Sequence, residues 1–420
     1  MRRWLAAVVV GLAVANLPVL AEEEKKDTKN ALREELLKLN AVTGEEAQLQ
    51  KLRLLLKDKT KAKQLVIEAG QMLKESKGKE NPFNFNGASI IARLAHINKQ
   101  YDIAEPFYEY MIEAATKLNS GSKLVTAYVG LVSLYFDSKK YALASETCEK
   151  FMDLTGPEEV EREQPFMLER LAKAKAKEEK FDEALRWADL LIDGSRDGAW
   201  YFLQTKGWIL REQGKLPAAI DAYLESLDKL EANKVLKPDL KERLKDATRY
   251  ALTGLYVDNK EIDKAAKHLQ ILIKRNPDNP TYKNDLGFIW CDNDMNLQES
   301  EKLIREALEL DRKEKEKLKE EGKIDEVKLN AAYLDSLGWV LFKQQKYKEA
   351  LEPLKQAAAD EDDGNHMEIW DHLADCYMAL GMKKEAIATW EQALKFEDLS
   401  KRDAERRRKI SEKLKKARTE

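Results

Sequence analysis

The chain has 420 residues, of which 35% are charged and 43% are hydrophobic, whereas an ordinary soluble protein is roughly 25% charged. It has 18 glycines and 10 prolines, too few for the many tight turns of a β-sandwich or barrel, and its apolar content excludes a wholly disordered chain. The formal net charge of −3 favours neither nucleic acid nor an anionic membrane as a partner. These numbers predict a protein that is almost entirely helical.

Residues 1–21 differ from the rest of the chain and predict an export signal. Two arginines precede an uncharged apolar run, Trp4–Leu17, and the small side chains of Val19 and Ala21 suit signal peptidase. The run is too short to span a bilayer comfortably, because a span takes about 20 apolar residues. We expect cleavage at about Ala21–Glu22, no membrane span afterwards, and a periplasmic or secreted protein. An uncleaved N-terminal anchor is the alternative.

Residues 22–82 begin with a charged stretch and continue with two amphipathic stretches, the first rich in leucine. This pattern predicts an N-terminal helical cap or a degenerate repeat ahead of the main array.

Residues 83–396 repeat one unit about eight times. Each unit begins with a helix in which a small residue stands next to an apolar one, and a short polar turn follows. An aromatic or aliphatic residue comes after the turn, and an alanine or serine three residues later marks the second helix. One helix pair cannot bury both of its faces, so the pairs are expected to stack. The residues that anchor the second helices are Ala104, Ala144, Ala184, Ala219, Ala265, Ser300, Ala350 and Ala386.

The repeated unit resembles the tetratricopeptide repeat, whose usual length is about 34 residues. The resemblance implies an all-α fold, an α-solenoid of stacked helix-turn-helix repeats wound into a right-handed superhelix. More narrowly, the segments Asn284–Gly287, Ala332–Trp339 and His372–Asp375 look like the C-terminal repeats of exported bacterial proteins of this family. That likeness implies a bacterial source and an envelope location.

Two charged segments depart from the repeat. Residues 312–328 alternate lysine and glutamate, which predicts a solvated extension of two neighbouring helices, with a partner-docking arm as the alternative. Residues 397–420 predict a charged C-terminal capping helix whose thin apolar face holds Leu399, Ile410, Leu414 and Ala417. Contact of this helix with anionic lipid or another polyanion is the alternative.

The chain contains no recognisable catalytic motif. Cys148, Cys291 and Cys376 are too few and too widely spaced for a disulfide framework, and we expect them to be buried as small hydrophobes. His366 and His372 are six residues apart, on different faces of a helix, and suit solvated side chains at a helix start better than metal ligands. We therefore expect no enzyme, no cofactor and no metal site.

The family resemblance also indicates where a partner would bind, because first helices line the concave face of such solenoids. It places on that face Trp208, Phe288, Trp339, Phe342, Tyr201, Arg211, Asn284 and Asp335. Aromatic side chains give large contact areas at low entropic cost. The alternative is that these rings pack sideways between neighbouring first helices.

We thus expect a non-catalytic module of the bacterial cell envelope that binds a protein or peptide segment. Two alternatives belong to other classes. One is a self-assembling structural scaffold, which would form a homo-oligomer. The other is a saccharide-binding or enzymatic protein on a solenoid frame.

Overall fold

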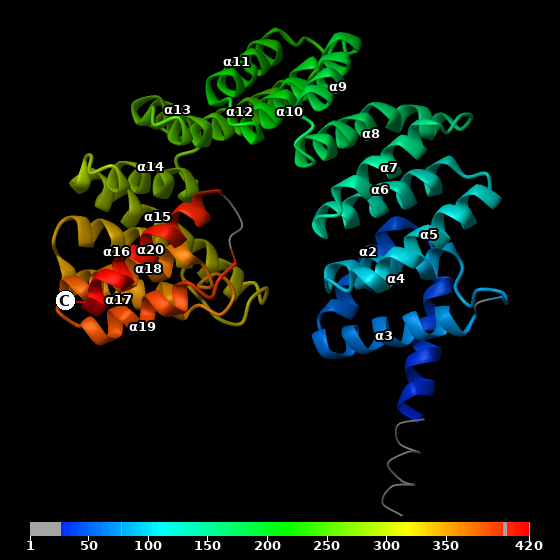
Figure 1. Cartoon of the computed structure of the whole chain (residues 1–420), viewed down its shortest axis with the longest axis horizontal. Helices are drawn as coiled ribbons and strands as arrows, with labels where there is room; N and C mark the ends of the chain where they lie inside the picture. Colours follow the sequence, from blue (N-terminus) through cyan, green and yellow to red (C-terminus); the bar gives the residue numbers. More distant parts are fainter. Residues whose placement is uncertain (1–26, 77, 398–400, 420) are drawn as a thin grey trace, which may run out of the picture. The chain divides into compact units, whose positions relative to one another are not determined.

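A computed structural model describes residues 27–76, 78–397 and 401–419, so the predicted export signal and Leu399 lie outside the described residues. Every regular element in the described ranges is a helix, and most connections are short turns (Figure 1). The chain divides into two compact units, Met1–Gln213 and Gly214–Glu420.

The N-terminal unit consists of a helical segment over 27–38, a short 3-10 helix and nine α-helices. Side-chain oxygens cap the N-termini of two of these helices. Asp58 accepts a hydrogen bond from the backbone N–H of Lys61, and Asn84 accepts from the N–H groups of Asn86 and Gly87. The bounds are η1 (Leu39–Ala41), α2 (Glu45–Leu56), α3 (Lys59–Glu75), α4 (Phe85–Ile97), α5 (Tyr101–Lys117), α6 (Gly121–Asp137), α7 (Tyr141–Met152), α8 (Glu158–Lys177), α9 (Phe181–Gly194) and α10 (Ala199–Glu212).

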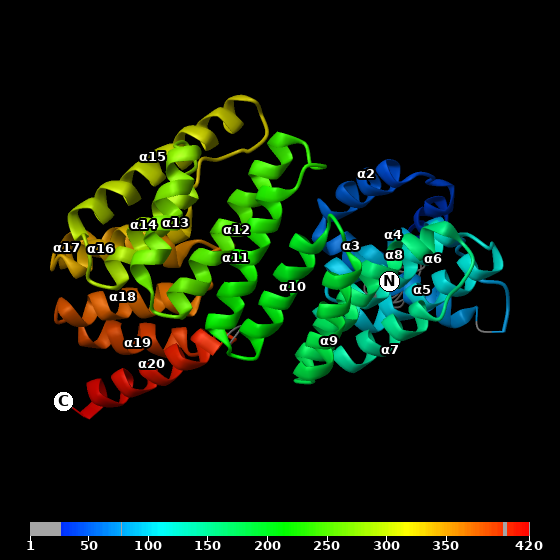
Figure 2. The same ribbon diagram turned by 90° about the horizontal axis from the view of Figure 1, so that it is seen from above.

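The C-terminal unit contains the remaining ten helices (Figure 2). They are α11 (Leu216–Ala232), α12 (Pro238–Asp258), α13 (Ile262–Arg275), α14 (Pro280–Asp292), α15 (Leu297–Glu320), α16 (Ala331–Lys343), α17 (Tyr347–Ala359), α18 (Met367–Ala379), α19 (Lys383–Ala393) and α20 (Lys401–Thr419).

Successive helices pack as pairs within each unit, α4 on α5 and α16 on α17 for example, and the pairs stack on one another. Small residues permit the close approach that the sequence predicts. A Cβ atom added at Gly338 would lie 2.3 Å from Cγ of Leu354, and one at Gly287 would lie 2.7 Å from Cγ1 of Ile304. The predicted all-α solenoid of stacked helix pairs is confirmed. The first helices of the repeats are α4, α6, α8 and α10 in the N-terminal unit and α12, α14, α16 and α18 in the C-terminal unit.

The turn from first to second helix has the same backbone geometry in all eight repeats. One residue in each turn has a positive φ, between 56° and 85°: Lys99, Lys139, Glu179, Gly214, Lys260, Asp294, Gln345 and Gly381. In seven of these turns the residue after it donates its N–H back to a carbonyl five positions earlier, as Gln100 does to Ala95 and Lys346 does to Leu341. This is the Schellman closure of a helix C-terminus.

The charged insertion extends only one helix. Helix α15 runs on to Glu320, but residues 321–330 are not helical, and α16 begins only at Ala331. The expectation of two extended neighbours is therefore wrong for the second helix. The backbone N–H of Asn330 donates to Asp311 at 3.0 Å, and this bond directs the chain back toward the core before α16 starts.

The three cysteines are free and buried, as the sequence predicts. Burial raises the pKa of the Cys148 and Cys291 thiols to about 12, so both stay protonated at neutral pH. Within the described ranges, no helix is long and apolar enough to cross a bilayer.

Candidate functional site

Carboxylates from all four first helices of the C-terminal unit form a set that we call the acidic strip. Its members are Asp258 at the end of α12, Asp292 at the end of α14, Asp335 in α16, and Glu368, Asp371 and Asp375 in α18. Helices α14, α16 and α18 contact one another in order. Arg406 of α20 bonds to two strip members and is electrostatically coupled to Asp292 and Asp335.

A stack of three rings lies at the centre of the strip. Trp339 lies almost parallel to His372, with 4.0 Å between ring centroids, and to Phe342 at 4.9 Å. The indole N–H of Trp339 donates to Asp292 Oδ1 at 3.2 Å. Three successive first helices are therefore joined through one tryptophan that is only 9% exposed.

His372 and Asp335 form a buried pair between α18 and α16. Nδ1 of His372 lies 3.0 Å from both carboxylate oxygens of Asp335, and His372 is 1% exposed. Desolvation lowers the pKa of His372, but the charge and hydrogen bond of Asp335 outweigh it, so the pKa is raised above its usual value. The expectation that His372 is a solvated side chain at a helix start is wrong, because stacking α18 on α16 buries this face. His366, by contrast, accepts from the N–H of Glu368 at the start of α18.

Asp371 and Asp375 lie one turn apart on α18, both against α20. Lys413 donates to Asp371 at 2.8 Å and to Asp375 at 2.6 Å, and the Trp390 indole also donates to Asp371, at 3.1 Å. Desolvation and the nearby charge of Asp371 raise the pKa of Asp375, while Lys413 opposes that rise. This part of the strip therefore requires a cation.

The eight residues predicted to line a binding face are divided between the two units. Trp208, Tyr201 and Arg211 are on α10 of the N-terminal unit, whereas the other five are on α14 and α16 of the C-terminal unit. Trp208 is half-buried, with the ammonium of Lys177 5.2 Å from its ring centre. The Tyr201 hydroxyl donates to Glu169 at 3.1 Å, and Arg211 is exposed.

Among the residues predicted on α14 and α16, the polar ones are the more deeply buried. Asn284 and Asp335 are each 5% exposed, and Oδ1 of Asn284 has no hydrogen-bond partner within the described part of the chain. Phe288 and Phe342 are half-buried and pack beside Trp339. The sideways packing that the sequence left open is the arrangement seen at Trp339, and the contact of these residues with a partner stays a prediction.

Sequence reasoning missed two features of these surfaces. Glu169 of α8 is buried and accepts from Thr205 at 2.9 Å and from Lys173 at 2.5 Å. Arg406 and Lys413 of α20 turn toward α18, although the charged sequence around them is typical of a solvated helix. One feature of the sequence could have indicated these contacts: an acidic side chain on an otherwise apolar face of a first helix. Such a side chain requires a hydrogen-bond or ionic partner when it is buried.

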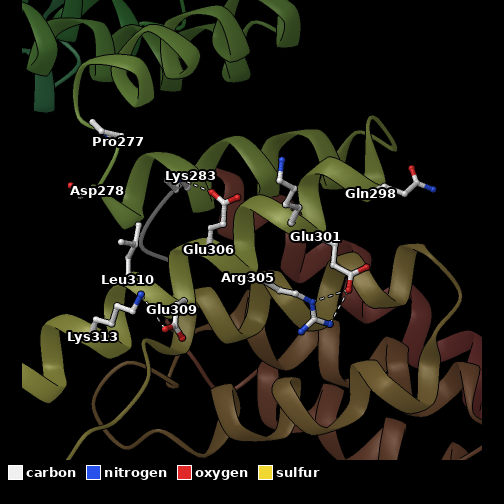
Figure 3. A pocket seen from close by; sticks show the side chains of 11 residues that line it. Pro277, Asp278, Lys283, Gln298, Glu301, Arg305, Glu306, Glu309, Leu310 and Lys313 are labelled. Atoms are coloured by element: carbon white, nitrogen blue, oxygen red, sulfur yellow. Dashed lines mark hydrogen bonds and ion pairs between the residues drawn. The ribbon is translucent and has the colours of Figure 1, made fainter.

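A pocket that is separate from the strip lies beside α15, where the turn between α13 and α14 approaches it (Figure 3). Its volume is about 650 Å³. The charged side chains on its wall pair with one another: Lys283 with Glu306 at 2.5 Å, and Arg305 with Glu301 at 2.8 Å. Such pairing is typical of a solvated helix surface. Across the described ranges, no group of His, Cys, Asp or Glu is arranged to hold a metal ion.

Comparisons with known proteins agree with the repeat. A family model described as tetratricopeptide repeat matches residues 341–402, and no curated protein matches the sequence. A tetratricopeptide repeat protein from Parabacteroides merdae is similar at 13% identity, over 72% of this chain and 98% of its own, with a TM-score of 0.46. The C-terminal part of a TPR repeat-containing protein from Cytophaga hutchinsonii is 16% identical over 66% of this chain and 97% of its own, with a TM-score of 0.38. MamA from Desulfovibrio magneticus RS-1 is 16% identical over 46% of this chain and 92% of its own, with a TM-score of 0.34. A residue with positive φ recurs in the turns of all eight repeats, and the match at 341–402 shows that the chain contains the tetratricopeptide repeat.

Proposed function

We propose that the protein is a non-catalytic scaffold of the bacterial cell envelope that binds segments of partner proteins along its first helices. Repeat solenoids of this kind use extended helical faces to bind other proteins. One observation carries the proposal for this chain: the first helices of the C-terminal unit already hold a helix, α20, through ion pairs as well as apolar contacts. A surface that binds a helix within its own chain has the shape and charge to bind one from another chain.

The N-terminal unit offers a second face of related character. Phe166 of α8 is 44% exposed and lies edge-on to Tyr201 of α10, with ring centroids 6.1 Å apart. The Tyr201 hydroxyl also bonds to the buried carboxylate of Glu169. Aromatic rings beside an acidic group suit a partner segment with apolar and cationic side chains.

The envelope location rests on the sequence of residues 1–21, with its basic start, apolar run and small residues before Glu22. Cell fractionation followed by intact-mass measurement tests it. We expect a periplasmic or secreted species that starts at about Glu22. A full-length chain that stays in the cytoplasm would contradict this part of the proposal.

Affinity capture from the native envelope fraction, followed by mass spectrometry, tests the binding function. We expect one protein to be enriched on the wild type and weakened on the double variant Asp258→Asn/Glu368→Gln, which removes two charges from the acidic strip. The matched control is Asp263→Asn/Glu349→Gln, which removes two exposed charges from the second helices α13 and α17. Equal enrichment on all three proteins would place binding outside the strip, and no enriched protein would contradict the binding function.

A further inference from the structure

Helix α20 has one thin apolar face. Ile410, Leu414 and Ala417 are its buried apolar side chains in the described range, and they pack with Met367 of α18 and Trp390 of α19. Figures 1 and 2 show α20 alongside these two helices. Helix α18, by comparison, buries five apolar residues in 13. The apolar anchorage of α20 is therefore weak for a helix of 19 residues.

One edge of α20 is ionic and faces the acidic strip. Arg402 pairs with Asp258 of α12. Arg406 pairs with Glu368 and, at 3.4 Å, with Asp371. Lys413 completes the edge with its bonds to α18. Helices α12 and α18 are thus bonded to α20 directly, while α14 and α16 are coupled to Arg406 through the charges of Asp292 and Asp335.

The strip depends on these cations. Asp371 and Asp375 are two carboxylates on adjacent turns of α18, largely removed from water, and Lys413 is bonded to both. Without α20, this edge of the first helices would present uncompensated negative charge beside the apolar side chains of Met367 and Trp390, which α20 covers. Such a surface selects a cationic, amphipathic segment.

The charge of α20 is well suited to reversible docking. Residues 401–419 contain ten lysines and arginines against three acidic residues. The pair of Arg402 with Asp258 is the most exposed on the arginine side, and salt screens it. A helix held by three buried apolar side chains and by a few ion pairs opens more readily than the helices beneath it.

We propose that α20 is an internal competitor for the acidic strip, and that the partner's contact there is a basic amphipathic helix that displaces it. This inference rests on the proposed binding function and names the class of partner. The partner helix would carry arginine or lysine at the spacing of Arg402, Arg406 and Lys413, with an apolar residue in the position of Ile410 or Leu414. Because α20 is tethered, its effective concentration at the strip is high, and a partner gains access only when α20 is released.

The test uses the full-length protein and a labelled peptide of residues 401–419 as the probe, with binding followed by fluorescence anisotropy. In the variant Arg406→Glu/Lys413→Glu, α20 should leave the strip, and the peptide should bind at least about tenfold more tightly than it binds the wild type. The matched control is Arg408→Glu/Lys415→Glu, with the same change of charge on exposed positions of α20. The control should bind the peptide as the wild type does, and added salt should weaken binding to the released variant.

Hydrogen exchange of the unmodified protein provides a second readout that needs no variant. The amides of α20 should exchange through an opening in which α18 and α19 stay protected. Exchange of all three helices together would make α20 an integral part of the fold and overturn the proposal. So would a released variant that fails to bind the peptide.

Two further outcomes separate this inference from others. If a partner is captured equally by the wild type and by Arg406→Glu/Lys413→Glu, the binding function stands and the competitor role of α20 is refuted. If light scattering shows a dimer that the same double variant dissolves, the strip holds α20 of a second copy, and the inference of a different partner is overturned.

Discussion

Replacing Trp339 with alanine should lower the free energy of unfolding of the C-terminal unit by about 4 kcal/mol, since truncating a buried tryptophan costs roughly 3–5 kcal/mol. The ring is 9% exposed, and it stacks on His372 and on Phe342. Aromatic pairs add about 0.5–1.5 kcal/mol beyond the area that they bury. The burial and stacking contributions are not additive, because both depend on the same ring. The expected loss in the free energy of unfolding therefore stays within the range for a buried tryptophan.

The variant Trp339→Phe separates the stack from the hydrogen bond. Phenylalanine keeps an aromatic ring between its neighbours but removes the N–H that donates to Asp292. Asp292 is an exposed residue, so water can replace the lost donor, and the cost should be about 1 kcal/mol. The half-buried Trp208 provides a comparison, and Trp208→Ala should cost less than Trp339→Ala.

Urea unfolding followed by circular dichroism at 222 nm measures these differences, with the denaturant slope monitored for a change of cooperativity. A loss below about 1 kcal/mol for Trp339→Ala would refute the reasoning. It would mean that the ring contributes little to packing in solution and is available to a partner, as the sequence alone allowed.

Three further predictions concern particular positions. Gly338→Ala should lower the free energy of unfolding by about 1–3 kcal/mol, because the added Cβ would collide with a leucine of α17. Gly254→Ala meets open space within α12 and should raise the free energy of unfolding by about 0.5–1 kcal/mol. Thermal unfolding of both variants measures the difference. Burial lowers the pKa of His268 to about 4, so stability should fall between pH 6.5 and 4, and His268→Gln should reduce that fall. The pKa of His372 is raised, so its stabilising contribution should be present below pH 6.5 and disappear as the pH rises through the folded-state value. A pH series of urea midpoints for wild type, His268→Gln and His372→Gln measures both effects, and a variant whose profile coincides with that of wild type would contradict the assignment for that histidine. Glu169→Ala should cost about 3 kcal/mol by leaving the buried Thr205 hydroxyl without its acceptor and Lys173 without its partner. An unchanged urea midpoint would show that water replaces the carboxylate.

The fold was largely predictable because small residues recur at the positions where the two helices of a repeat pack closely. Gly287 and Gly338 recur at the same place in their units, and both are places where a Cβ would collide with the second helix. The exception is the insertion. Its alternating charges are equally compatible with helix and with a solvated loop. The helix ends at Glu320, where Gly322 has a positive φ and Lys323 donates its N–H back to Leu318, and the bond from Asn330 to Asp311 then brings the chain back.

The site was less predictable because its contacts join residues of different repeats. Asp335 and His372 are 37 positions apart, at nearly the same place in successive units, and periodicity alone does not show which of two such polar residues faces inward. Arg406 and Asp371 are 35 apart, and Arg402 and Asp258 are 144 apart. Those pairs depend on how α20 crosses the first helices, which no local pattern determines.

The eight turns between first and second helices carry a consequence for how this protein could be made more robust. At six of them a residue other than glycine adopts a left-handed backbone, a conformation that costs such residues roughly 1 kcal/mol. Lysine occupies three of the six, at positions 99, 139 and 260. At each of these positions glycine would remove the strain of the left-handed backbone, but it would also increase the conformational entropy of the unfolded chain. The net gain in the free energy of unfolding is therefore about a few tenths of a kcal/mol per turn. If the stack behaves as a one-dimensional array, these small gains should accumulate from turn to turn, and thermostability could be raised in graded steps without altering any helix face that meets another protein.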